Sequence, residues 1–173
     1  MTVAFADEAG FYLLPSVVRT WARVGKTPVL RTPCKYDHLS VASAITAGGK
    51  LVTQIRDTSF DGGAIVDFLK HLLREIPGKV MLIWDGARIH NCNAVKAFLC
   101  AGGAARLELV RLPAYSPELN PDEGVWHWLK RRLGNVCCLT QEELRYELRL
   151  AIMKLRYRPS IIKAFFGMAG LQL

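Results

Sequence analysis

Residues 79–86, Lys-Val-Met-Leu-Ile-Trp-Asp-Gly, decide the class of fold that this sequence can adopt. The run from Lys79 to Trp84 is continuous and largely apolar, which favours a short strand buried on both faces of a sheet. The run stops abruptly at Asp85. Because a helical pattern precedes this strand and another follows it, the segment predicts an α/β fold.

Two further segments carry acidic residues at comparable points. Val3-Ala4-Phe5-Ala6 is an apolar run that stops at Asp7, and Ser116–Glu123 is a proline-rich loop that opens a helix with Glu123 in its first turn. Carboxylates at the ends of buried elements are costly unless they are paired or bound to a metal. We predict Asp7 and Asp85 at the carboxyl ends of neighbouring strands, where α/β sheets present ligand sites. Oxygen ligands of this kind suit magnesium.

Each acid also has a purely structural interpretation. Asp7 and Asp85 could begin a turn or cap a helix. With Asn120 as the N-cap, Glu123 falls at the third helical position, so Asn120–Glu123 is also a capping box with proline at the first position. Considered one at a time, the three residues leave both interpretations open.

The remaining elements follow from periodicity and turn residues. We predict strands over Thr2–Asp7, Val17–Trp21, Pro28–Thr32, His38–Thr46, Lys50–Arg56 and Leu107–Leu112, with turns at 24–27 and 47–49. We predict helices after Asp61, over Asn91–Cys100, from Asn120, after the capping box Thr140–Glu143 and after Pro159. This order indicates an α/β fold with a mixed sheet, in a single domain spanning residues 1–173.

Composition limits the class of protein. The chain has 173 residues, 51% of them apolar and 22% charged, which suits one well-buried domain. No apolar run reaches the ~18 residues that a membrane helix needs, and no signal peptide is visible. Five cysteines, with one vicinal pair and no C-x-x-C, fit neither a disulfide framework nor the usual zinc spacings. We therefore expect small buried thiols and a cytoplasmic protein.

The positive charge is concentrated near the C-terminus. Of the net charge of +8, residues 130–173 contribute +6, with 9 Lys and Arg against 3 Asp and Glu. A polyanion is a natural partner for this asymmetry, although a solvated basic helix face would give the same pattern.

Four motifs together resemble a known family, the DDE transposases of the insertion-sequence 630 and mariner superfamily. The residues that carry the resemblance are Asp7-Glu8-Ala9-Gly10-Phe11, Arg19–Pro28, Trp84-Asp85-Gly86-Ala87-Arg88-Ile89-His90 and Leu112–Trp126. The last contains Y-S-P-x-L-N-P-x-E-x-x-W, which is highly specific. One difference is Gly86, where family members more often have asparagine.

The resemblance implies an RNase H-like fold, a mixed five-stranded sheet flanked by helices. It implies Asp7, Asp85 and Glu123 as catalytic residues that bind two Mg²⁺ ions, with Mn²⁺ able to substitute. The 37 residues between Asp85 and Glu123 suit this triad. We expect Glu8 to face away from Asp7 because successive strand residues alternate. Asp122 fits a residue that interacts with the helix dipole.

The activity implied is metal-dependent DNA cleavage followed by strand transfer. Alternatives are a stand-alone RNase H-like nuclease and a non-catalytic DNA-binding remnant of a decayed element. DNA is the expected partner, together with further copies of the chain and no membrane. In a bacterium the protein would associate with the nucleoid. We expect the N-terminal helix-turn-helix region to be absent from this domain, either because the chain is the second frame of a split gene or because it is a truncated copy.

DNA contact is expected from the helix that Glu123 begins. Lys130, Arg131 and Arg132 lie further along this helix and suit phosphate contact. Trp128 lies off the apolar stripe and is a candidate for exposure, whereas Trp126 fits the core. His90, five residues after Asp85, could approach the scissile phosphate or simply stabilise its loop.

Overall fold

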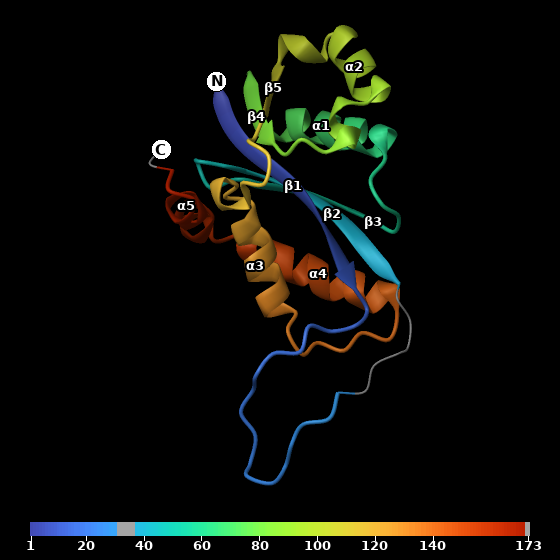
Figure 1. The fold of residues 1–173 in the computed structure, drawn as a ribbon, viewed down its shortest axis with the longest axis vertical. Helices are drawn as coiled ribbons and strands as arrows, with labels where there is room; N and C mark the ends of the chain where they lie inside the picture. Colours follow the sequence, from blue (N-terminus) through green and yellow to red (C-terminus); the bar gives the residue numbers. More distant parts are fainter. Residues whose placement is uncertain (31–36, 172–173) are drawn as a thin grey trace.

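A single five-stranded sheet organises the chain in the computed structural model, which describes residues 1–30 and 37–171 (Figure 1). The strand order is β3-β2-β1-β4-β5. The strands are β1 (Thr2–Tyr12), β2 (His38–Thr46), β3 (Leu51–Arg56), β4 (Val80–Trp84) and β5 (Leu107–Arg111). β1 pairs antiparallel with β2 and parallel with β4, so the predicted mixed sheet is confirmed.

Helices cover both faces of this sheet. The helices are α1 (Gly62–Glu75), α2 (Asn93–Cys100), α3 (Glu123–Arg132), α4 (Gln141–Arg156) and α5 (Pro159–Met168). Alternation along β1 separates two cores: Ala4 and Ala6 pack with α1 and α2, whereas Phe5 and Phe11 pack with α3, α4 and α5. The sheet therefore has a different helical layer on each face (Figure 1).

Local capping confirms two predicted helix starts. The side chain of Asp61 accepts a hydrogen bond from Ala64 N at 2.8 Å and caps α1. Thr140 accepts one from Glu143 N at 3.2 Å and caps α4, while Glu143 accepts one from Leu139 N. The hairpin at 47–49 is also confirmed, with Gly49 at a φ of +88°.

Four strand predictions are wrong, in whole or in part. β1 does not stop at Asp7 but continues to Tyr12, because β2 pairs with it along that whole length. Val17–Trp21 is not a strand, and the described part of Pro28–Thr32 is not one either, although the turn near Gly25 is present. Residues 31–32 and Cys34 lie outside the described residues. β4 buries only its face toward α1 and α2, since Met81 and Ile83 are half-buried.

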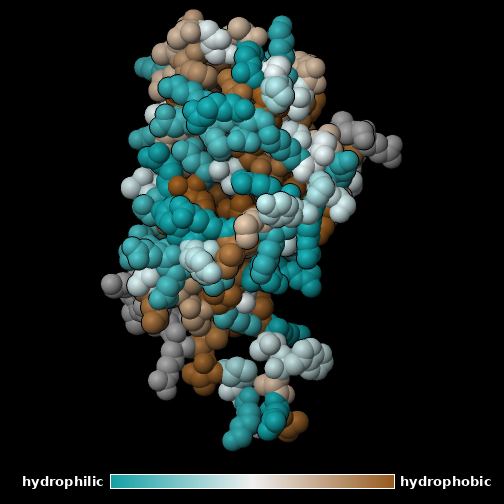
Figure 2. Space-filling view, turned by 180° about the vertical axis from the view of Figure 1, so that it is seen from behind, coloured by the Kyte–Doolittle hydropathy of each residue, from teal (hydrophilic) through white to brown (hydrophobic). Residues whose placement is uncertain are grey.

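Residues 14–30 project from the body instead of extending the sheet (Figures 1 and 2). Trp21 is 100% exposed and Val17 is 81% exposed. Asn135 anchors the base of the projection, because its side chain accepts a hydrogen bond from Val18 N and donates one to Val18 O. Apolar periodicity predicts strands here, but the described residues contain no strand that pairs with this segment.

The described cysteines are free thiols: Cys92, Cys100, Cys137 and Cys138, of which Cys138 is buried and Cys100 exposed. Across the described ranges, no helix has the length and apolar character that crossing a bilayer requires.

Candidate active site

Asp7 and Asp85 lie level with each other on adjacent strands. The parallel register of β1 and β4 ends at Phe5 opposite Ile83, and each aspartate follows two residues later. β4 has ended at that point, whereas β1 continues beside β2. The two carboxylates thus stand where the parallel ladder opens, which is where α/β sheets place their ligand sites.

Asp7 is held by the core on the α3 side of the sheet. Trp126 Nε1 donates to its Oδ2 at 3.0 Å, and Glu8 N donates to its Oδ1 at 2.8 Å. Burial raises the pKa of Asp7 to about 6, and the nearby charges of Glu123 and Glu8 act in the same direction. The two hydrogen bonds lower it by less than burial raises it.

Glu123 begins α3, the helix that also carries Trp126. Its amide donates to Asn120 O at 3.1 Å, and Asn120 Oδ1 accepts from Asp122 N at 3.1 Å. In the part of the chain that the structure describes, Asn120 N donates to Pro117 O and not to Glu123. The predicted capping box is therefore absent: the N-cap of α3 is Asp122 and not Asn120, and Glu123 is the first helical residue and not the third. The exposed Glu123 side chain is left free for another role.

Close packing fixes the start of α3 against α5. A Cβ on Gly124 would lie 2.5 Å from Phe165 Cγ, so only glycine allows this approach. The backbone beside Glu123 is thereby held in place.

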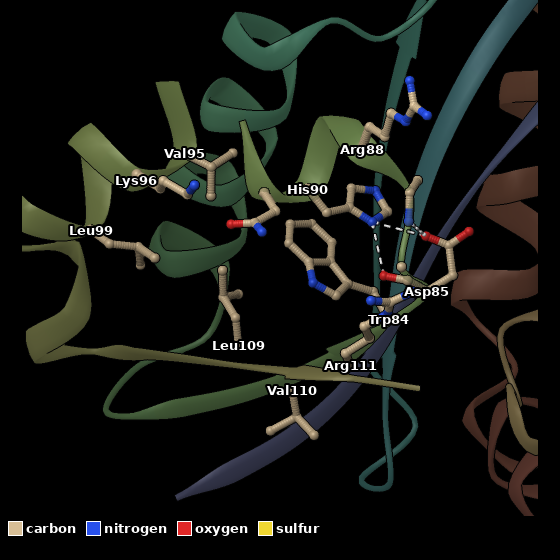
Figure 3. A pocket seen from close by; sticks show the side chains of 13 residues that line it. Trp84, Asp85, Arg88, His90, Val95, Lys96, Leu99, Leu109, Val110 and Arg111 are labelled. Atoms are coloured by element: carbon tan, nitrogen blue, oxygen red, sulfur yellow. Dashed lines mark hydrogen bonds and ion pairs between the residues drawn. The ribbon is translucent and has the colours of Figure 1, made fainter. Parts of the chain in front are cut away.

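Asp85 is held by a turn and by His90. Its side chain is 56% exposed, and its Oδ1 accepts a hydrogen bond from Ala87 N at 2.9 Å. His90 Nδ1 lies 2.9 Å from the same oxygen as an ion pair and donates a hydrogen bond to the backbone oxygen of Asp85 at 3.2 Å. His90 belongs to a 3₁₀ turn, η1 (Arg88–Asn91), and is only 3% exposed. Its ring stacks on Trp84 with centroids 3.9 Å apart (Figure 3). The turn interpretation of Asp85 thus holds alongside any catalytic one.

Glu8 reaches the same histidine from β1. His90 Nε2 donates to both Glu8 carboxylate oxygens at 3.1 Å. Burial alone would lower the pKa of His90, but the hydrogen bond and charge of Glu8, together with Asp85, raise it above its usual value. Both ring nitrogens face acceptors, an arrangement that favours the doubly protonated imidazole. As expected, Glu8 faces away from Asp7: it contacts η1, whereas Asp7 contacts α3.

The Glu8–His90 link could not be predicted from spacing, because 82 residues separate the two side chains. The role of Trp126 as a donor to Asp7 was likewise missed. Its apolar spacing predicts a core residue, which it also is. Its indole N–H is the one signal that could have suggested a polar partner.

Asp122 is a further acid at this site, and its burial was not predicted. It is 0% exposed, and Ser43 Oγ on β2 donates to its Oδ2 at 2.5 Å. Its other oxygen is buried and has no hydrogen-bond partner among the described residues. Burial raises the pKa of Asp122 well above its ordinary value, and Asp7, Glu8 and Glu123 act in the same direction. A position at the start of a helix gave no sign of this environment.

The donor set fits a hard divalent cation. Asp7, Asp85 and Glu123 offer only carboxylate oxygens. The pKa of Asp7 is raised mainly by burial and further by the charges of Glu123 and Glu8, and a bound cation would favour its ionised form. Within residues 1–30 and 37–171, no three His, Cys, Asp or Glu side chains are gathered closely enough to form a metal shell. A bound ion would therefore have to draw the carboxylates together.

The residues predicted to contact DNA differ in solvent exposure. Lys130, Arg131 and Arg132 are exposed at the last turn of α3. Trp128 is half-buried against the core, and His90 is buried, so neither offers an open ring face. The geometry of His90 instead favours a positioning role beside Asp85.

Comparisons with known proteins extend this description. The profile of the DDE superfamily endonuclease family matches residues 2–145. No curated protein sequence matches the chain significantly. Among solved structures, a pre-cleavage Mos1 transpososome is similar with a TM-score of 0.65 and 14% identity, over 99% of this chain and 56% of that one. The catalytic domain of Mos1 mariner transposase is similar with a TM-score of 0.59 and 12% identity, over 99% and 83%.

These likenesses show the fold. The chain shares the RNase H-like arrangement of the Mos1 catalytic domain, a mixed five-stranded sheet flanked by helices. It spans about 56% of the length of the Mos1 chain in the transpososome. Since the family profile covers most of the sequence, including all three predicted site residues, the chain belongs to the DDE superfamily of endonucleases.

Proposed function

We propose that this chain is the catalytic domain of a transposase, which cuts DNA strands and joins them to new positions. The observation that carries the proposal is the level placement of Asp7 and Asp85 on adjacent parallel strands, with the Glu123 helix tied to Asp7 through Trp126. Family membership supports endonuclease chemistry, and the structural neighbours are transposases.

Asp7, Asp85 and Glu123 would hold two divalent ions, Mg²⁺ by preference and Mn²⁺ as a substitute. Mos1 structures containing Mg and Mn support this choice of metal. Such ions lower the pKa of an attacking water and stabilise the leaving oxygen.

The surrounding residues keep the two aspartates oriented. Trp126 fixes Asp7 from the core, and His90 fixes Asp85 while Glu8 balances the charge on its ring. In the first reaction, water attacks the phosphorus and a P–O bond to the sugar breaks, which leaves a free hydroxyl. In the second, a 3′-hydroxyl attacks a phosphodiester of the target strand in place of water. A new P–O bond forms, and the P–O bond to the 3′-oxygen of the target strand breaks and leaves a free 3′-hydroxyl there. No covalent bond to the protein is needed.

DNA is the proposed substrate. Lys130, Arg131 and Arg132 on α3 would contact its phosphates. The Mos1 neighbours include complexes with transposon ends. We further propose that the chain acts as a homo-oligomer. An enzyme with this substrate would work in the cytoplasm, at the nucleoid in a bacterium.

Two other activities are less well supported. A stand-alone nuclease would share the carboxylates but not strand joining, and a decayed DNA-binding remnant would need neither. The neighbouring transposases and the level aspartates favour the transposase.

The test is a strand-cleavage and joining assay. A labelled oligonucleotide duplex with a pre-cut 3′-hydroxyl end is incubated with supercoiled plasmid and Mg²⁺ or Mn²⁺. We expect the wild type to nick the plasmid and join the label to it, and Asp85→Ala to do neither. Nicking without joining would favour the nuclease. Equal activity in Asp85→Ala, or no metal-dependent nicking by the wild type, would contradict the proposal.

A further inference from the structure

A hollow lies beside Asp85, between helix α2 and the carboxyl ends of β4 and β5 (Figure 3). Its volume is about 560 Å³, within the range of small-molecule binding sites. Asp85 and Gly86 form part of its wall. Anything bound in the hollow would therefore lie next to the proposed cleavage site.

The lining of the hollow is cationic. Arg88, Lys96 and Arg111 belong to it, and Asp85 is its one acidic residue. All three basic side chains are exposed, and in the described part of the chain none of them has a hydrogen-bond or ion-pair partner. Three unpaired cations around one concavity attract an anion.

Arg111 is fitted into the site by Gly86. A Cβ on Gly86 would lie 2.1 Å from Arg111 Nε and 2.2 Å from its Nη2. The absence of a side chain therefore lets the guanidinium lie against the backbone directly after Asp85. The planar fork of arginine matches the oxygens of a phosphate group.

The rest of the lining suits a nucleobase. Leu99 and Leu109 are half-buried and offer apolar surface, and the amide of Asn91 can both donate and accept hydrogen bonds. Amide side chains of this kind pair with base edges. A phosphate ion alone would not contact the apolar wall favourably, and an apolar ligand would leave the cations without a partner. A nucleotide matches both parts of the lining.

We infer that this hollow binds one nucleotide of the DNA strand that the active site cuts, with its phosphate on Arg88, Lys96 and Arg111 and its base against Leu99 and Leu109. The inference rests on the proposed function. A base can enter only when it leaves the helical stack, which is least costly in an unpaired strand. The hollow would thus select unpaired nucleotides next to the cut.

The test is a nuclear magnetic resonance titration of the full chain, methyl-labelled at Leu and Val, with EDTA present. The probes are deoxyadenosine monophosphate, deoxyadenosine and inorganic phosphate. We expect only the monophosphate to shift the methyls of both Leu99 and Leu109 at low concentration. Weaker binding by about tenfold is expected in Lys96→Ala, which removes a phosphate contact. Gly86→Ala should weaken binding severalfold by displacing Arg111 without changing charge.

The matched control is Lys163→Ala, which removes an exposed positive charge from α5, outside the hollow. It should bind the monophosphate as the wild type does. Equal weakening in Lys163→Ala would mean that binding reflects net charge only, and unmoved Leu99 and Leu109 methyls would overturn the site. Equal affinity for deoxyadenosine and the monophosphate would overturn the role of the cations.

A second titration uses DNA itself. Single-stranded pentathymidylate should shift the Leu99 and Leu109 methyls, whereas a blunt duplex of matched length should leave them in place. Shifts of equal size with the duplex would contradict selection of unpaired nucleotides. Because no metal and no cleavage are involved, failure of the nicking assay would refute the proposed function while leaving nucleotide binding independently measurable.

Discussion

Asp7 is held by the hydrophobic core, whereas Asp85 is held by a turn at the surface. The indole of Trp126, itself only 2% exposed, fixes Asp7, and burial raises the pKa of that carboxyl to about 6. Asp85 is 56% exposed, and its partners are a turn amide and the His90 ring. The two carboxylates would bind the same ions, but different parts of the molecule fix their orientations.

This difference predicts that substitutions around Asp7 and substitutions around Asp85 will have different effects. A substitution in the core should disturb Asp7 and also lower the free energy of unfolding, because the same residue, Trp126, orients Asp7 and packs α3 against the sheet. Disturbing Glu8 or His90 should affect Asp85 with less cost to the core. The backbone ladder between β1 and β4 has ended before both aspartates, so Glu8 and His90 supply the link that continues across this gap.

The largest effect is expected when either carboxylate is neutralised. Asp7→Asn and Asp85→Asn should each reduce metal-dependent nicking at least about a thousandfold, since metal-ion stabilisation is worth several kcal/mol. Their stabilities should differ. In urea unfolding at pH 7, Asp7→Asn should gain about 1–2 kcal/mol because it removes a poorly solvated charge, while Asp85→Asn should lose less than about 1 kcal/mol. Equal changes in the free energy of unfolding in the two variants would contradict the difference between Asp7 and Asp85.

The next effect concerns the link to Asp85. Glu8→Gln should weaken Mn²⁺ binding and nicking by about 10–100-fold, the usual cost of losing a residue that orients a metal ligand. Calorimetric titration with Mn²⁺ measures the affinity directly. His90→Phe, which keeps a ring on Trp84 but loses both hydrogen bonds, should behave alike. Unchanged affinity in both variants would show that Asp85 needs no support from this pair.

Trp126→Phe should have a smaller effect on activity and a clear one on stability. It keeps an aromatic ring in the core but removes the Nε1 donor to Asp7. We expect a loss of about 1–3 kcal/mol in urea unfolding and a fall in nicking of about tenfold. Trp128→Phe is the matched control, since Trp128 is half-buried and makes no described contact with Asp7. A larger loss of activity in the control would contradict the role of Trp126.

The smallest effect is a pH dependence of stability in EDTA. Because the pKa of Asp7 is raised from 3.8 to about 6, the folded state binds more protons between these values, and stability should fall by about 2 kcal/mol as pH rises through that window. The raised pKa values of Asp122 and His90 add losses of the same sign as pH rises above the unfolded pKa of each. Asp7→Asn should remove the first fall only. A stability that rises between pH 4 and 6 in EDTA would contradict this assignment.

Much of the fold could be predicted because its signals are local. Asp61 and Thr140 cap their helices as expected, and the glycines at 48–49 close the predicted hairpin. The apolar spacing on α4 places Leu144, Leu148 and Leu155 in the core. Each of these depends on residues within a few positions of one another.

The missed features depend on residues far apart in sequence. Asp7 looked like a strand end because only the pairing with β2 reveals that β1 continues. Ser43 buries Asp122, and Glu8 meets His90, across 79 and 82 residues. The spacing at 17–21 resembled a strand, but a strand needs a partner, and the projecting segment has none in the described chain. These features depend on contacts between residues far apart in sequence, and the local periodicity of a sequence does not reveal such contacts.

The central claim is that Asp7, Asp85 and Glu123 share one divalent metal site. Calorimetric titration with Mn²⁺ tests it most directly, on the wild type, Asp7→Asn, Asp85→Asn, Glu123→Gln and the control Glu118→Gln, an exposed acid in the loop before α3. We predict that each of the first three variants weakens binding at least about tenfold, while the control binds as the wild type does. Wild-type affinity in any of the three, or equal loss in the control, would contradict the shared site.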